Sequence, residues 1–463
     1  MLRKESQRKY GMDMCHGPLL KKILVFALPL IASGLLQLCY NAADTVVVGR
    51  FADADALAAV GANTHLIDLL VNLALGLSVG INVLAAQCYG AKKFEDVNRT
   101  VHNALCLALL LGVSVGVAGI LLGERLLALM ACPENIIGQA VLYLRIYMLS
   151  MPAMLIYNFG AAILRSAGNT RQPLQFLTIS GIVNVLVNLL LIIVFRMGVA
   201  GVAIATAASQ YLSAALMLRC LHRREDCLRL SSRKLGLQWD LVKPILYIGI
   251  PAGLQSTLIA LPNVLIDACV NSFGSQAVAG VAASNNLEGF LHAAMVAISN
   301  TAQAFIGQNV GGRQYGRITK IVKICILLEL VTAAGMAALF CVLSEPLLRI
   351  YLPSAPEAAA VGAARNLIVF SGIFLMGFIN VFMAAMRGMG YSITPAVTVL
   401  AGLCGVRVVW ICTAFAYNRT LPVLFLAFPA SWIVTAGAQF VCYLILYRRF
   451  LRQNTEQHAL EII

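Results

Sequence analysis

Long apolar segments separated by short polar ones run through this sequence from end to end. A helix of about 20 apolar residues crosses a hydrocarbon core of ~30 Å, and these runs lack the period-two alternation of barrel strands. Because lipid leaves backbone groups without water, only helices and closed barrels can span it. The pattern predicts an all-α integral membrane protein with twelve transmembrane helices. They lie near residues 23–48, 57–86, 101–123, 137–163, 173–195, 198–218, 245–270, 278–306, 321–343, 361–386, 394–417 and 422–447.

The two halves of this pattern repeat each other at a separation of about 222 residues. Short landmarks recur with nearly the same offset over most of each half, which chance matching of apolar composition does not explain. The matched positions are Pro29 with Pro251, Asp44 with Asp267, Gln87 with Gln308, and Pro173 with Pro395. We therefore expect two six-helix lobes with a common ancestry.

An even number of helices in each lobe has a geometric consequence. Both lobes enter the membrane from the same side, so they are expected to be related by a pseudo-two-fold axis along the membrane normal. Duplicated bundles of this kind place the substrate path between the lobes and work by rocking. The expected parts are an N-terminal segment at 1–22, the N-lobe at 23–218, a basic linker at 219–244, the C-lobe at 245–447 and a tail at 448–463.

Composition agrees with the membrane class and gives an orientation. Apolar residues make up 60% of the 463 positions and charged residues 12%, about half the charged share of a soluble domain. The net charge of +14 reflects Lys and Arg gathered in the loops of one side rather than a nucleic-acid surface. The opposite loops hold only Arg50, Arg125, Arg196, Arg349 and Arg419. Both termini and the linker are therefore expected in the cytoplasm.

Other chemistries are not indicated. The 13 cysteines form no CxxC pair and lie mostly in apolar runs, so neither a disulfide framework nor a metal site is expected. The GLSVG sequence at Gly76–Gly80 fits a nucleophile motif, but it lies within an apolar helix, where small residues serve close packing. We expect no enzyme, no cofactor and no signal peptide ahead of the first span.

A polar stripe marks the first predicted helix. Gln37, Tyr40, Asn41 and Asp44 follow one another at i, i+3, i+4 and i+7, so they share one helical face. An ionisable group at mid-bilayer costs ~2.5–3.5 kcal/mol on insertion scales, and this stripe should therefore face a cavity. A carboxyl group there could bind and release a proton. The alternative is a structural carboxylate, hydrogen-bonded or close to the outer interface.

The fifth predicted helix carries a second polar face. Ser180, Asn184 and Asn188 are spaced by four residues. They could orient Asp44 or bind substrate, or they could join helices by hydrogen bonds worth ~0.6 kcal/mol on average.

Polar residues of the C-lobe lie at other places. We single out a charged cluster whose members are Asn263, Asp267, Glu288, Gln303 and Arg407. Arg407 lies far from any loop, so we expect it to pair with Glu288 or Asp267, most simply as a structural ion pair.

Several sequence blocks together resemble a known family. They are LPLIASGLLQLCYNAADTVVVGRF, LAAVG, AQCYGAKK, MGVAGVAIAT, GVAASNNLEGF, FIGQNVGGRQYGR, MRGMGYSITP and GVRVVWI. Over about residues 17–450 the chain resembles the multidrug and toxic compound extrusion (MATE) family, in particular its DNA-damage-inducible-protein-F-like branch. The resemblance implies a V-shaped pair of six-helix lobes that exports cationic or amphipathic compounds by proton or sodium antiport.

The resemblance also assigns candidate site residues. Asp44 matches the essential acid of the family's first helix, and Asn184 and Thr206 match polar members of the same N-lobe cation site. Asn188 stands where many relatives have a second aspartate, which favours protons over Na⁺ as the coupling ion. The C-lobe acids of sodium-coupled relatives are replaced by Ile259 and Met376. Glu288 matches a recurrent acid of the family.

The function expected from residues and resemblance together is secondary active export by alternating access, coupled to H⁺ or Na⁺. The alternative is a flippase of a lipid-linked precursor, which would need a strongly basic central cavity for a diphosphate. Small-molecule substrates and the lipid bilayer are the expected partners, with no nucleic acid and a monomeric chain. The expected location is the bacterial inner membrane.

Overall fold

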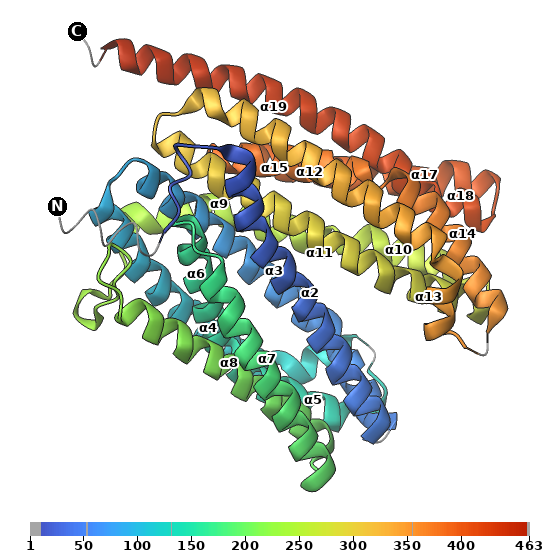
Figure 1. Ribbon diagram of the computed structural model, residues 1–463. Coiled ribbons are helices and arrows are strands. Elements are labelled where there is room, and N and C mark those ends of the chain that lie inside the picture. The colour runs from blue at the N-terminus through green and yellow to red at the C-terminus, as the bar shows by residue number, and fades with distance from the viewer. Residues whose placement is uncertain (1–10, 52–53, 131, 354, 461–463) are drawn as a thin grey trace. The chain divides into compact units, whose positions relative to one another are not determined.

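The computed structural model describes residues 11–51, 54–130, 132–353 and 355–460. The regular elements of these ranges are all helical, and no β-strand occurs among them (Figure 1). The chain divides into two compact units. The first comprises Leu28–Gly253 with the described residues before Cys15, and the second comprises Cys15–Ala27 and the chain from Leu254 onward.

The first unit is built from long apolar helices. They are α2 (Leu19–Phe51, from Leu28), α3 (Ala54–Gly90), α4 (Phe94–Leu129), α5 (Glu134–Leu149), α6 (Met151–Ser166), α7 (Arg171–Leu189), the π-helical η1 (Leu190–Val194), α8 (Gly198–His222), a short 3₁₀ turn (Ser232–Lys234) and α9 (Trp239–Leu258, up to Gly253). Its core is a cluster of buried aliphatic side chains around Phe159 and Met217.

The second unit repeats this plan with more interruptions. Its helices are α10 (Ala260–Asn271), α11 (Ser275–Gly311), α12 (Tyr315–Val342), α13 (Ser344–Tyr351), α14 (Pro356–Gly372), α15 (Phe374–Gly388), α16 (Ile393–Val399), the π-helical η3 (Leu400–Gly405), α17 (Val406–Trp410), the π-helical η4 (Ile411–Phe415), α18 (Leu421–Phe425) and α19 (Ala427–Leu460). Phe370, Phe425 and Trp432 lie at the centre of its core.

Each of the twelve predicted apolar segments coincides with one helix or with two consecutive helices, except 394–417, which comprises α16, η3, α17 and η4 in succession. Within the described ranges, nine helices are long and apolar enough to cross a membrane, and the pairs α5–α6 and α14–α15 qualify when each is taken as one bent span. The remaining predicted segment is α11, whose 37 residues are more polar because they include Asn285, Glu288 and His292. The prediction of an all-helical membrane protein is confirmed.

The sequence repeat is reproduced in the backbone, including its irregular points. The α5–α6 pair bends by 45° at Ser150, and the α14–α15 pair bends by 46° at Ile373, an equivalent position of the repeat. The π-helical segments η1 and η4 also correspond. Even the uncommon positive φ angle of a non-glycine residue recurs, at Lys92 (59°) and Arg313 (55°).

Glycines bring helix backbones together inside the first unit. A Cβ atom at Gly76 would lie 2.1 Å from the Gly253 nitrogen, and one at Gly80 would lie 2.2 Å from the Ile245 oxygen. Helix α3 therefore packs backbone to backbone on α9, as small residues allow in membrane proteins. The GLSVG segment serves packing here, as predicted.

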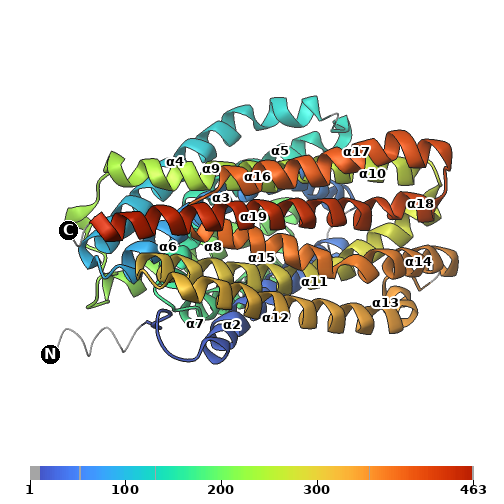
Figure 2. The same ribbon diagram turned by 90° about the horizontal axis from the view of Figure 1, so that it is seen from above.

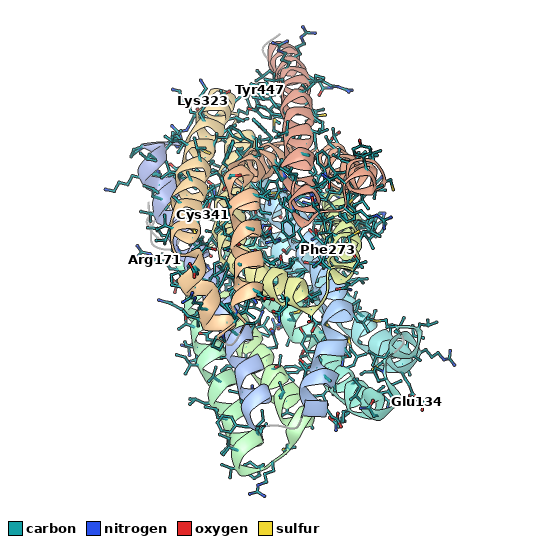
Figure 3. All side chains as sticks on the ribbon, turned by 90° about the vertical axis from the view of Figure 1, so that its right-hand side faces the viewer. Glu134, Arg171, Phe273, Lys323, Cys341 and Tyr447 are labelled. Carbon is teal, nitrogen blue, oxygen red and sulfur yellow. The ribbon has the colours of Figure 1, made fainter. Side chains whose placement is uncertain are left out.

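Aromatic rings connect α19 with α15 and α12 in the second unit. Helices α15 and α19 run beside each other (Figure 2), and Phe382 stacks on Tyr443 with centroids 5.3 Å apart. Tyr443 in turn stacks on Tyr447, whose hydroxyl oxygen accepts a hydrogen bond from Thr319 of α12. Figure 3 labels Tyr447 near Lys323 of α12, at one end of this unit.

Candidate functional site

Asp44 of the first unit lies against Asn188 of α7. Asn188 Nδ2 donates a hydrogen bond of 2.8 Å to Asp44 Oδ1. The Asp44 side chain is partly exposed, whereas Asn188 is completely buried. The structure therefore brings together two of the four residues predicted for cation coupling.

Asn184 and Thr206 extend this group along α7 and α8. Asn184 lies one turn before Asn188 and donates a long hydrogen bond of 3.4 Å to Ser209 Oγ. Ser209 donates to the backbone oxygen of Thr206, and the Thr206 hydroxyl donates to Val202. Thr206 is thus connected to Asn184 through Ser209, a residue that the sequence analysis missed. Its spacing of three from Thr206, on the same face of α8, was the available signal.

The amide oxygens of this group are left without donors. Asn184 Oδ1 and Asn188 Oδ1 are both buried, and neither has a hydrogen-bond partner among the described residues. Together with the Asp44 carboxylate they form a set of oxygen acceptors on α2 and α7. Such a set attracts a proton or a hard cation, because ionised carboxylates and amide oxygens only accept hydrogen bonds.

The other predicted cavity residues have different surroundings. The Tyr40 ring lies directly on Gly181, where an added Cβ atom would come within 2.0 Å of it, and its hydroxyl donates to the Thr178 oxygen. Ser180 donates to the oxygen of Leu177 in its own helix. Gln37 and Asn41 are exposed. The stripe on α2 therefore has Tyr40 fixed to α7 one turn before Asp44.

Arg407 of the second unit has amide and hydroxyl partners. Its Nη1 donates to Asn263 Oδ1 at 2.7 Å, and its Nε donates to Ser431 Oγ at 3.2 Å. Its guanidinium carbon lies 4.4 Å from the centre of the Phe428 ring. The predicted ion pair of Arg407 with Glu288 or Asp267 is wrong.

Glu288 pairs instead with Arg365 of α14. The Arg365 Nη2 to Glu288 Oε2 distance is 2.7 Å, and Arg365 Nη1 donates to Ser284 Oγ at 2.5 Å. Arg365 is 2% exposed, and its guanidinium lies 5.2 Å from the Phe428 ring centre. The sequence analysis missed Arg365, although a lone arginine inside the apolar segment 361–386 was the signal.

The predicted C-lobe cluster is therefore not one group. Asp267 is exposed on α10, and buried Gln303 lies about four helical turns from Glu288 along α11. Its charged members form two neighbouring sets around Phe428, one with Arg365 and Glu288 and one with Arg407 and Asn263. Among the residues that the structure describes, no group of three or more His, Cys, Asp or Glu side chains could hold a metal ion.

Comparison with known proteins identifies the same repeat. The sequence model described as MatE matches residues 29–190 and again 251–412. A protein named probable multidrug resistance protein YoeA, of Bacillus subtilis, is 27% identical over 90% of this chain and 91% of its own length. A protein named FAD transporter, of Shewanella oneidensis, is 25% identical over 65% of this chain and 67% of its own length.

The fold also matches solved structures. One described as the outward-facing conformation of a multidrug resistance MATE family transporter of the MOP superfamily has a TM-score of 0.90. The match covers 96% of this chain and 99% of that one at 18% sequence identity. The predicted architecture of twelve helices in two lobes is confirmed by this likeness.

Proposed function

Since this chain belongs to the MatE family of membrane transporters, we propose that it is a secondary active exporter of cationic or amphipathic small molecules. Export would be driven by antiport of a cation, and the proton is the ion that we favour. The chain would act as a monomer in the bacterial inner membrane, with both termini in the cytoplasm. Names of relatives that refer to multidrug resistance support the substrate class.

The observation that carries this proposal is the contact between Asp44 and Asn188. One carboxylate faces one neutral amide, so the site holds a single negative charge. A proton neutralises one carboxylate completely. A site for Na⁺ ordinarily gains from further negative charge, which an aspartate at position 188 would supply.

Protonation of Asp44 would change its hydrogen bonding. As a carboxylate it accepts from Asn188 Nδ2, whereas as an acid it can also donate, and the unpaired oxygens of Asn184 and Asn188 lie on the facing helix. The ion would thus draw α2 toward α7.

Prolines offer the place where α2 can bend in response. Pro29 lies inside α2 and removes one hydrogen bond of its ladder. Helix α2 belongs to the second unit up to Ala27 and to the first unit from Leu28, so the boundary between the units lies beside this proline. In α9 the boundary between the first and second units follows Gly253, two residues after Pro251. Bends at these equivalent prolines would allow the alternating access that export requires.

The test is transport by the purified full-length chain in proteoliposomes, with pH and sodium gradients imposed separately. The substrate panel should contain cationic dyes and, because one relative is named a FAD transporter, flavin nucleotides. We expect efflux to follow the pH gradient without sodium. A strict sodium requirement would overturn proton coupling, and no transport under any gradient would overturn the exporter assignment.

The variant that tests the choice of coupling ion is Asn188→Asp. A second carboxylate beside Asp44 should give the protein a sodium response and tighten apparent Na⁺ binding by roughly tenfold or more, because two charges at ~4 Å interact by about 4 kcal/mol at an effective dielectric constant of ~20. If Na⁺ has no effect on this variant, the amide at position 188 does not determine ion choice.

The flippase alternative gains no support from the second unit. A diphosphate group needs uncommitted cations. Arg365 and Arg407 already bond to Glu288, Ser284, Asn263 and Ser431, and Arg387 donates to Gln255.

A further inference from the structure

A second acid lies in the membrane-spanning part of the second unit. Glu329 is near the middle of α12, a candidate membrane span of 28 residues, and it is 1% exposed. Within the described part of the chain neither of its carboxyl oxygens has a hydrogen-bond partner. The position 222 residues earlier is Leu107, so this acid has no counterpart in the first unit.

Glu329 is packed tightly against α15. A Cβ atom added to Gly377 would lie 2.9 Å from the Glu329 Cβ and 3.4 Å from its Oε2. The carboxyl group therefore rests on the backbone of α15 at a position that only glycine leaves open. The close contact between Gly377 and Glu329 thus forms a fitted site for the carboxyl group, so Glu329 is not an acid that happens to lie at the surface.

Apolar hollows lie on both sides of Glu329 along α12. One, of about 260 Å³, is lined by Ala333 and Ala337 of α12 with Phe370 and Phe374 opposite. The other, of about 410 Å³, is lined by Ile326 of α12 with aromatic residues of α15 and α19. Neither hollow offers Glu329 a charged group among its lining residues.

The charged groups of α12 and its neighbouring helices leave Glu329 unpaired within the described ranges. The titratable or charged groups on α12 and the helices around it include Tyr315, Arg317, Lys320, Lys323, Cys325 and Cys341 on α12, Glu288 and His292 on α11, Glu345, Arg349 and Tyr351 on α13, Glu357 and Arg365 on α14, Arg387 on α15, and Cys442, Tyr443, Tyr447, Arg448, Arg449 and Arg452 on α19. Arg365 is bonded to Glu288 and Arg387 to Gln255. None of these groups forms an ion pair or hydrogen bond with Glu329 in the described ranges.

An ionised carboxylate in such a place is strongly unfavourable. Burial of an unpaired charge costs far more than burial of a neutral acid, and groups in this position neutralise instead. At mid-membrane an ionisable residue that faces protein also marks an ion or proton pathway by default. In the arrangement described here, Glu329 must therefore hold a proton.

We infer that Glu329 is a second proton-binding site, located in the second unit and separate from Asp44. The inference rests on the proposed function, because a proton bound at Glu329 can contribute to ion-driven export only if it is released during the transport cycle. Release leaves a carboxylate that needs a donor. Asn380 lies within one turn of Gly377 on α15, and its buried Nδ2 has no partner among the described residues. It can donate to Glu329 when α12 and α15 shift.

Infrared difference spectroscopy of the full-length protein tests this directly. We expect the wild-type protein at neutral pH to show the carbonyl band of a protonated carboxyl group that disappears in Glu329→Gln and persists in Asp44→Asn. Glu345→Gln removes an exposed glutamate of the same unit and should leave the band unchanged. An identical band in wild type and Glu329→Gln would overturn the inference, whatever the transport assays give.

Two further measurements cover the other outcomes. If Glu329→Gln does not fold, an apolar carbodiimide, which reacts with protonated carboxyl groups, should label Glu329 in the wild-type protein, and mass spectrometry maps the site. No labelling there would overturn the inference. Where the variant folds and exports, it should move one proton fewer per substrate, whereas Glu329→Asp should retain the wild-type ratio. An unchanged ratio in Glu329→Gln would overturn the proposed release step.

Discussion

The two units handle buried charge in opposite ways. In the first, Asp44 is bonded to the neutral amide of Asn188, and nearby amide oxygens lack donors. In the second, Arg365 is neutralised by Glu288, and Arg407 is held by Asn263 and Ser431. The first unit therefore has an incompletely bonded acid beside neutral amides, whereas in the second unit Arg365 and Arg407 have their partners within the same unit.

Equivalent positions of the repeat show how the difference arose. Asp44 corresponds to Asp267, and at the same offset Asn184 corresponds to Arg407. Asp267 is exposed on α10, whereas the arginine that replaces the amide is buried and stacked on Phe428. At these equivalent positions, one copy of the repeat thus has an acid beside amides and the other has an arginine bonded to an amide and a serine. A sharp functional asymmetry is expected between the units.

The largest expected effect comes from Asp44→Asn. The amide cannot bind or release a proton, so gradient-driven export in proteoliposomes should fall to the level of protein-free liposomes. Folding and insertion should persist, because asparagine keeps the shape of the side chain. Transport rates and thermal unfolding of the purified variant measure the two properties.

The control for this variant is Asp55→Asn, in α3 of the same unit. Asp55 is exposed, so its loss should leave export unchanged. Wild-type export by Asp44→Asn would contradict the central role of the first unit. Equal loss in both variants would show a general effect of removing negative charge.

The next effect is on stability and concerns Arg365→Met. This change leaves Glu288 without its cation, and breaking a buried pair costs ~3–5 kcal/mol. Glu288 is 24% exposed at its side chain, so we expect the lower end, about 3 kcal/mol in the free energy of unfolding.

The double variant Arg365→Met/Glu288→Leu isolates the pair. It should recover most of the loss, because an apolar pair of similar volume often replaces a buried ion pair without cost. Denaturant unfolding of the two singles and the double gives the coupling energy. Strictly additive losses would show that the pair is not coupled.

Much of the fold could be predicted because it depends on properties that act along the chain. The length of the apolar runs predicted the positions of all twelve segments, and the internal repeat predicted their division into two sets of six. The bend at Ser150 also had a local signal, because Pro152 lies in the first turn of α6. The equivalent bend at Ile373 has no proline after it, and there Gly372 lies close to Pro429 of α19, a contact between distant segments that has no local signal.

The candidate site could be predicted only in part. The sequence analysis singled out Asp44 and Asn188 because polar side chains are energetically costly in apolar helices, and a polar side chain in such a helix is visible from the residue type alone. The partner of a buried charge depends on which helix faces it. Arg407 therefore received a carboxylate partner in the prediction and bonds Asn263 in the structure. Ser209 gave little signal, since serine is common in small-residue helices.

The smallest expected effect concerns the contact of Phe428 with two arginines of the second unit. Phe428 lies under both Arg407 and Arg365, at 4.4 and 5.2 Å from the ring centre. Cation–π contacts contribute ~0.5–2 kcal/mol, so Phe428→Leu should lose about 1–2 kcal/mol more than a change that only removes ring packing. The matched variant is Phe425→Leu, which alters a buried ring with neither arginine over it among the described contacts. Equal losses of stability in the two variants would mean that the arginines of the second unit are held by their hydrogen bonds alone, and that Phe428 contributes packing and no charge stabilisation.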